Sequence, residues 1–290
     1  MRYGILLCLL FCTFTATFAQ KKAHKNQERL AMDLAEALAK KFAAVEAVGL
    51  GGHSGESIKL TVRNTGSKVL RLKTPQGQLM EPANTAEQTL VVAATEWTTV
   101  APGKAAEVLL KTFCTQAGDL SPGVNAMFSV GLMAPQALCN LLKFLSDQGK
   151  IDSPDAQASV WCVTNHRAIA NIGDKQLARF VAELVGKNTP SYTIRRKTEI
   201  VRPGQPADLG KAMLVEGNYT YTLDRDEQLY MALHDGAGKF LKQISKVETM
   251  TAGEHRSGFH LEVYNIPPEK YIVRVQTKKG KIIKDIEVDF

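Results

Sequence analysis

Apolar residues three or four positions apart run through the first part of the chain, from Asn26 to about Ala47. The stripe consists of Leu30, Leu34, Leu38, Phe42 and Val45. Charged residues separate its members, and a glycine-rich stretch at 49–52 ends it. This period predicts an amphipathic helix within an N-terminal segment of residues 20–52. We expect the narrow, Ala-rich stripe to pack on the domain that follows.

Beyond the glycines, apolar and polar residues alternate, as is typical of strands with one buried face. The alternation predicts strands at residues 58–62, 69–72, 89–93, 97–100 and 107–114. The turn residues Asn64-Thr65-Gly66-Ser67 predict a hairpin between the first two. Several short strands at this spacing are typical of a β-sandwich.

The period becomes helical again between Ala134 and Gly186. Three apolar stripes cover residues 138–145, 157–169 and 177–184. Ser153, followed by Pro154 and Asp155, predicts a helix start with a capping hydroxyl. We therefore expect three short helices on or beside the sandwich, within one domain of residues 53–187.

Three prolines and a basic cluster predict a linker over residues 188–214. Alternation then returns to the end of the chain. It predicts strands at residues 219–223, 229–233, 240–244, 259–263, 271–275 and 282–288. These form a second sandwich over residues 215–290, so the fold class is mainly β with a helical subdomain (α+β).

The first nineteen residues have the pattern of a secretory signal peptide. Arg2 precedes an apolar run too short to span a bilayer, and Thr17 and Ala19 occupy the positions that a signal peptidase reads. We expect residues 1–19 to be removed and the protein to be secreted, into the periplasm, onto the outer surface or outside the cell. The sequence contains no later apolar run long enough for an integral membrane span.

Removal of the signal leaves Cys114, Cys139 and Cys162 of the five cysteines. Cys139 and Cys162 lie at similar distances on either side of the turn at Lys150-Ile151. Two antiparallel helices joined there would bring them opposite each other, which predicts a disulfide in an oxidising compartment.

The net charge of +7 is mild and spread along the chain. Nucleic-acid binding would need the cations beside stacking aromatic residues, and that combination is missing. None of the six histidines has a second histidine at a metal-ligand spacing. They are His24, His53, His166, His234, His255 and His260. The sequence therefore indicates no metal, no cofactor and no catalytic residue.

The C-terminal unit resembles the immunoglobulin-like modules that end secreted bacterial proteins, including the sorting domains of type IX secretion and the flagellar-hook-cap module. The resemblance rests on the turn His234-Asp235-Gly236-Ala237-Gly238-Lys239, the strand entry Ile266-Pro267-Pro268-Glu269-Lys270-Tyr271 and the turn Lys279-Gly280-Lys281. Glu269-Lys270 replace the usual glycine, and the chain ends without the usual basic residues. The resemblance implies a sandwich and, with it, contact with secretion machinery.

A second resemblance covers residues 57–165. Phe113-Cys114 closes a predicted strand, and Ala156-Gln157-Ala158-Ser159-Val160-Trp161 follows after predicted helices. This is similar to the thioester domains of bacterial surface adhesins, with their aromatic-Cys pair and apolar-Gln-x-x-apolar-Trp pattern. The resemblance implies a thioester between the Cys114 sulfur and the Gln157 side-chain carbonyl. Gln157 and Trp161 share a helix face, so the indole would cover the bond. The alternative is that Cys114 and Trp161 are ordinary core residues.

These observations favour a binding or structural protein of the cell surface that is not an enzyme, with an unidentified protein or glycan as its partner. The first alternative is a covalent adhesin that uses the Cys114–Gln157 thioester. The second is a hydrolase with an unrecognised site, which would need Cys114, His166 and an acid within hydrogen-bond reach.

Overall fold

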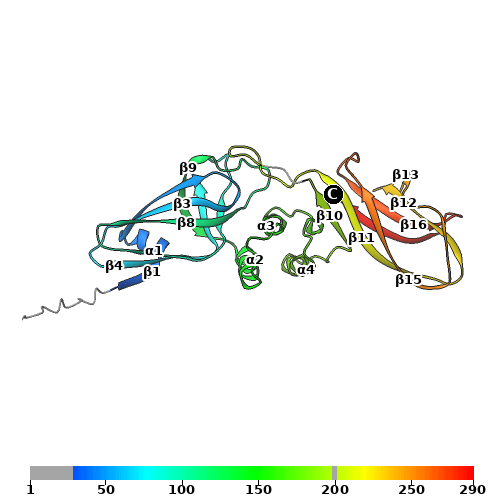
Figure 1. The fold of residues 1–290 in the computed structure, drawn as a ribbon, viewed down its shortest axis with the longest axis horizontal. Helices are drawn as coiled ribbons and strands as arrows, with labels where there is room; N and C mark the ends of the chain where they lie inside the picture. Colours follow the sequence, from blue (N-terminus) through cyan, green and yellow to red (C-terminus); the bar gives the residue numbers. More distant parts are fainter. Residues whose placement is uncertain (1–28, 198–200) are drawn as a thin grey trace, which may run out of the picture.

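The computed structural model describes residues 29–197 and 201–290. The expected signal peptide lies outside these residues. The chain is mainly β with a small helical part, as its alternation predicts. It forms an elongated molecule with a β-barrel at one end, helices in the middle and a second β unit at the other end (Figure 1).

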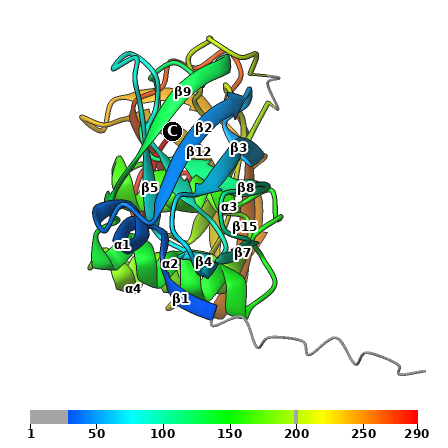
Figure 2. The ribbon, with the colours of Figure 1, turned by 90° about the vertical axis from the view of Figure 1, so that its left-hand side faces the viewer.

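Six antiparallel strands close into the barrel in the order β2-β3-β8-β6-β5-β9. They are β2 (Ala43–Leu50), β3 (Ser54–Asn64), β5 (Gln78–Pro82), β6 (Leu90–Val92), β8 (Ala105–Cys114) and β9 (Val124–Met133). Figure 2 shows β2, β3 and β9 running along one side of it. Fully buried Leu60, Leu90 and Leu110 contribute to its core. The expected first sandwich is therefore a closed barrel.

A three-stranded sheet packs against the barrel in the order β1-β4-β7. It consists of β1 (Arg29–Asp33), β4 (Val69–Thr74) and β7 (Glu96–Val100), with the short helix α1 (Leu34–Ala39) beside it. Leu34 and Leu72 belong to the same buried cluster as the barrel residues. This sheet and the barrel thus share one core.

Two predictions for this region are wrong. The N-terminal amphipathic helix is limited to the six residues of α1, because Ala43 and Ala47 alternate with exposed Ala44 and Glu46 and fit a strand instead. The hairpin at Asn64 is also absent, since β3 pairs with β2 and β8 while β4 pairs with β1 and β7.

Three helices follow the barrel, as their stripes predict: α2 (Gln136–Asp147), α3 (Ala156–Thr164) and α4 (Lys175–Leu184), with a 3-10 turn η1 (Ile169–Asn171). Their core includes Val91 and Phe113 of the barrel strands. Ser153 does not cap α3; Asp155 occupies the N-cap position, and its carboxylate accepts a hydrogen bond from the backbone of Asp174 at 2.8 Å instead.

The C-terminal unit consists of two antiparallel sheets that enclose one apolar core. The first has the order β10-β11-β15, and the second β13-β12-β16-β17 with β14 also paired to β12. Their bounds are β10 (Tyr192–Arg196), β11 (Ala212–Leu223), β12 (Glu227–Asp235), β13 (Phe240–Gln243), β14 (Glu248–Met250), β15 (Gly253–Glu262), β16 (Lys270–Thr277) and β17 (Ile282–Asp289).

The segment expected to be a linker is more ordered than its composition indicates. Its early part forms β10, which belongs to the C-terminal unit. Its later part, residues 203–209, lies against the loop that follows β8, and we call it the strap. Four backbone hydrogen bonds of 2.7–3.0 Å join strap residues 204–207 to residues 118–121. The strap therefore ties the C-terminal unit back to the barrel.

Candidate functional site

The structure brings Cys114 and Gln157 together, although 43 positions separate them in the sequence. Cys114 is the last residue of β8, and Gln157 lies in the first turn of α3. The Cys114 N–H donates to Gln157 Oε1 at 3.1 Å, and Gln157 Nε2 donates to the Cys114 carbonyl oxygen at 2.9 Å. The whole carboxamide is thus held against the residue that carries the thiol.

Cys114 holds this position because β8 ends there. Its backbone N–H also donates to the carbonyl oxygen of His53 at 3.0 Å, next to the pairing of β3 with β8. On its other side Cys114 lies opposite Leu90 of β6. Two barrel strands therefore fix the cysteine backbone, and α3 delivers the glutamine to it.

The Cys114 side chain has no exposed surface. Burial raises the pKa of its thiol, because the charged thiolate would lose its hydration. The group is therefore an uncharged thiol at neutral pH and is shielded from reagents in solution. Such an enclosed sulfur suits either an inert core residue or a reactive bond that must be kept dry.

Trp161 lies one helical turn after Gln157 and is only 2% exposed. It belongs to the same buried cluster as Cys114. Its indole N–H is buried and has no hydrogen-bond partner among the described residues. An unpaired buried donor is costly, so this N–H is free to bind an acceptor within the site.

His53 completes the group, and sequence reasoning missed it. Its ring stacks on Trp161 with a centroid distance of 6.2 Å and an interplanar angle of 17°. Burial lowers the pKa of His53, so the imidazole is neutral at neutral pH. No spacing in the sequence links a histidine after two glycines to Trp161; only the barrel geometry places them together.

The two hydrogen bonds fix both polar atoms of the Gln157 carboxamide. The Cys114 N–H already points at the oxygen that would become negatively charged if the thiol added to the Gln157 carbonyl carbon. The leaving nitrogen is also held, by its hydrogen bond to the Cys114 carbonyl. The structure thus brings together Cys114 and Gln157, the two residues of the thioester candidate, through the backbone of the cysteine.

The disulfide prediction is corrected. Cys114, Cys139 and Cys162 are all free. The Cys139 thiol donates to the Ala134 carbonyl oxygen at 3.3 Å, whereas the Cys162 thiol approaches the Ala168 carbonyl oxygen at 3.5 Å. The two sulfurs lie on helix faces that contact different neighbours. Burial raises the pKa of Cys162 to about 12.

The hydrolase alternative needed a base beside Cys114. His166 is exposed and lines a cleft with Asp208 and Arg196, and no hydrogen bond joins it to the buried Cys114.

Among the described residues, no group of three or more His, Cys, Asp or Glu side chains could hold a metal ion. The helices of the described part are too short or too polar to cross a membrane.

No protein-family model matches the chain, and no curated protein is significantly similar to it.

Proposed function

We propose that this chain is a secreted cell-surface protein that captures its target covalently, through a thioester between Cys114 and Gln157, and without catalytic turnover. The observation that carries the proposal is the pairing of the Gln157 carboxamide with both backbone polar groups of Cys114. The signal-like residues 1–19 support export, because they combine a basic start with a short apolar run.

The bond would form inside the folded protein. The Cys114 sulfur adds to the Gln157 side-chain carbon, the carbon–nitrogen bond breaks, and the amide nitrogen leaves as ammonia with the thiol proton. The Cys114 N–H stabilises the oxygen during this step. The raised pKa of Cys114 slows this step, because it keeps the proton on the sulfur and a thiol is a weaker nucleophile than a thiolate.

Capture follows from the same chemistry. An amine or hydroxyl of the target attacks the thioester carbonyl, an amide or ester bond to Gln157 forms, and the Cys114 thiol is released. The protein is consumed in the reaction, so one chain captures one target. A stoichiometric reaction of this kind needs no metal ion, and the described residues contain no group that could hold one.

The alternative is purely structural: the Gln157 side chain forms hydrogen bonds with the backbone N–H and C=O of Cys114 at the end of β8, where a neighbouring strand would otherwise do so. Mass spectrometry distinguishes the thioester from this structural role. The thioester predicts an intact mass about 17 Da below that of the plain sequence, and incorporation of methylamine at Gln157 with release of one thiol.

The variants Cys114→Ala and Gln157→Ala should both show the plain mass and take up no methylamine. Cys162→Ala is the matched cysteine control, because Cys162 is also buried and free, and Gln176→Ala is the glutamine control on α4. Both controls should keep the mass deficit. A wild-type protein with the plain mass and no methylamine adduct would reject the thioester.

A further inference from the structure

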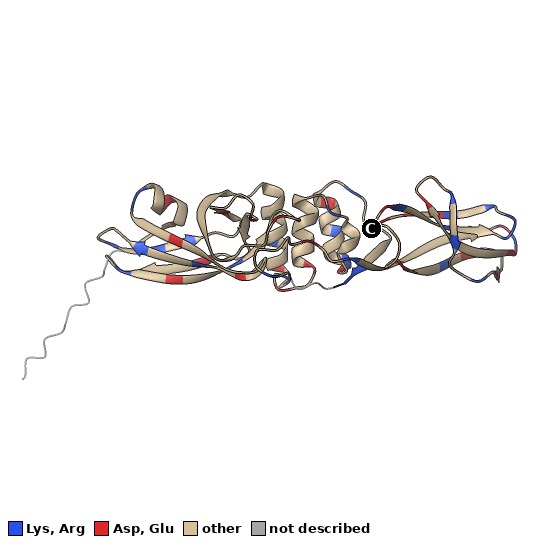
Figure 3. Ribbon diagram, turned by 90° about the horizontal axis from the view of Figure 1, so that it is seen from above, with Lys and Arg blue, Asp and Glu red and all other residues tan. Residues whose placement is uncertain are grey.

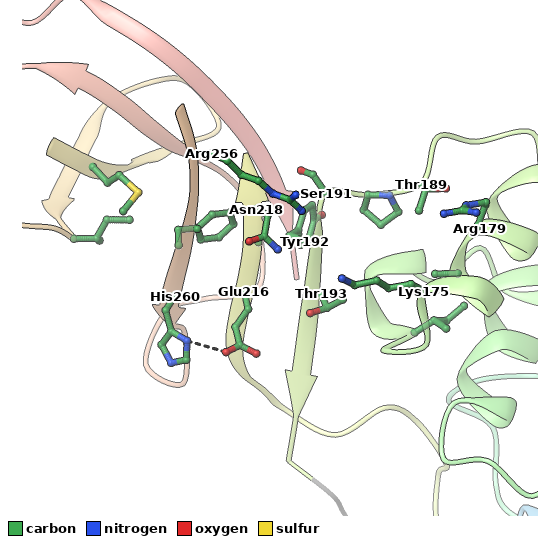
Figure 4. A pocket seen from close by; sticks show the side chains of 18 residues that line it. Lys175, Arg179, Thr189, Ser191, Tyr192, Thr193, Glu216, Asn218, Arg256 and His260 are labelled. Atoms are coloured by element: carbon green, nitrogen blue, oxygen red, sulfur yellow. Dashed lines mark ion pairs between the residues drawn. The ribbon is translucent and has the colours of Figure 1, made fainter. Parts of the chain in front are cut away.

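A large open cavity of about 830 Å³ lies far from Cys114, between α4 and the first sheet of the C-terminal unit (Figure 4). One wall is α4, which contributes Lys175 and Arg179. The other is the sheet β10-β11-β15, which contributes Asn218 and Arg256. The covalent site described above does not involve any of these residues.

The strand register shows that the floor of this cavity is the outer face of the sheet. Asn218 lies opposite Gly258, and Thr220 lies opposite Arg256, so their side chains leave the sheet on the same side. The intervening Tyr219 and Phe259 are buried in the core of the unit. At Gly258 a Cβ would approach the Gly217 carbonyl oxygen to 3.3 Å, so the glycine keeps the floor flat.

The cavity is positively charged. Lys175, Arg179 and Arg256 all line it, and none forms an ion pair in the part of the chain that the structure describes. The one carboxylate on the floor, Glu216, is paired with Arg195 at 3.2 Å and with His260 Nδ1 at 2.8 Å. Elsewhere the two signs of charge are interspersed along the molecule (Figure 3). Three unpaired cations around one cavity therefore favour an anionic ligand.

The cavity continues into a second one of about 540 Å³, which shares Ser191, Asn218 and Arg256 with the first and is also lined by Lys284, Asp285 and Glu287 of β17. Asp285 is paired with Arg274 at 2.8 Å, so among the described lining residues the unpaired cations still outnumber the unpaired carboxylates. Together the two cavities form a groove, which we call the cationic groove. Two adjoining cavities of about 830 and 540 Å³ offer room for an extended chain, which is more than a single small anion would fill.

We infer that the cationic groove binds an acidic oligosaccharide. The floor is the face of the sheet, and its central strand β11 is hydrogen-bonded on both sides, so a ligand on this face meets side chains and not unpaired backbone groups. The groove presents hydroxyl and amide side chains instead, from Ser191, Thr193 and Asn218. These can bind sugar hydroxyls, while the cations bind carboxylate or sulfate groups.

Binding to a nucleic acid is less well matched, because its bases would need exposed rings to stack on. Phe259 is buried, and Tyr192 is held to β17 by its hydroxyl, which accepts a hydrogen bond from the Asp289 N–H at 2.9 Å.

The test uses the full chain and a galacturonate hexasaccharide, with maltohexaose as the neutral saccharide, and calorimetry at low salt. We expect the acidic saccharide to bind and the neutral one not to. The triple variant Lys175→Gln, Arg179→Gln, Arg256→Gln should weaken binding at least about tenfold, because it removes three charges within a Debye length of the ligand. Each single variant should weaken it less.

The control is the triple variant Lys239→Gln, Lys242→Gln, Lys246→Gln, which makes the same change in net charge at exposed positions around β13. It should bind like the wild type. Equal weakening in this control, absence of binding by the wild type, or equally tight binding of a hexaglutamate peptide would each overturn the inference. Cys114→Ala should leave the affinity unchanged, so failure here is separate from failure of the thioester.

Discussion

Trp161 combines a buried ring with a buried polar atom that has no partner. Its ring belongs to the same core cluster as Cys114, and its indole N–H has no hydrogen-bond partner among the described residues. In the proposed thioester reaction a negative oxygen develops on Gln157, one helical turn before Trp161, and a second donor would stabilise it. We therefore propose two roles for the indole, as a cover for the bond and as a donor during its formation.

Two substitutions at Trp161 separate these roles. Trp161→Phe keeps a ring over the site and removes the N–H, so we expect the mass deficit to develop more slowly after refolding but to persist. Trp161→Ala also removes the cover, so any thioester should be lost to hydrolysis within the preparation. Time-resolved intact mass measures both. Identical kinetics for wild type and Trp161→Phe would contradict the donor role.

The sequence alone identifies a site residue when its type and its order relative to other residues match a known motif. Cys114, Gln157 and Trp161 match such a motif, and the structure places Cys114 against Gln157 and in the same core cluster as Trp161. His53 could not be found, because its stacking on Trp161 depends on the barrel bringing the residue just before β3 next to α3. The pairing of Cys139 with Cys162 failed because spacing about a turn does not fix which face of each helix a residue occupies.

At the scale of one element, α4 shows how a short helix is fixed in place. Asp174 is its N-cap, and one carboxylate oxygen accepts from the backbones of Gln176 and Leu177 at 3.0 and 2.9 Å. The other accepts from Lys150 at 2.6 Å. These bonds stabilise the charged carboxylate, so they lower the pKa of Asp174, with the Lys150 hydrogen bond as the largest cause.

Asp174→Ala should therefore lower the free energy of unfolding by about 1 kcal/mol, the usual value for loss of a cap. A lowered carboxyl pKa stabilises the fold above the ordinary value of 3.8, and this stabilisation disappears as pH falls below it. Denaturant unfolding at pH 7 and near pH 3 should show a smaller difference between variant and wild type at the lower pH. Asp147→Ala, which removes an exposed ion pair on α2, should change stability much less. An effect of Asp174→Ala that is the same at both pH values would argue against the cap.

Most elements could be predicted from periodicity, but their pairing could not. The strands around residues 58–62 and 69–72 exist, yet the turn between them does not form a hairpin. Asn64 is buried, and its amide donates to the carbonyl oxygens of Lys68 and Val100, both at 2.8 Å. These bonds direct the chain out of the barrel into the β1-β4-β7 sheet. Such a choice depends on a residue 36 positions away, which local pattern cannot show.

In the whole molecule, the strap joins the C-terminal unit to the end of the barrel core that contains Cys114. Ala207 of the strap has no exposed surface and belongs to the same cluster as Cys114 and Trp161. Its backbone is bonded to residues just after β8, at Gly118 and Asp119. The segment that leads into the C-terminal unit therefore also closes the barrel core that contains the thiol. Movement of that unit would be transmitted to the cover of the proposed thioester.

Ala207→Asp tests this arrangement, because a carboxylate at a fully buried position without a partner costs several kcal/mol and should displace the strap. We expect native Cys114 to become accessible: the thioester should hydrolyse to the plain mass plus about 1 Da, with a free thiol that alkylating reagents reach. Ala105→Asp, at an exposed position at the start of β8, should keep the mass deficit and the protection of Cys114. Circular dichroism should show that the strands of both proteins remain. If Cys114 stays protected in a folded Ala207→Asp protein, the strap does not seal the site, and the barrel and α3 alone keep water from the sulfur.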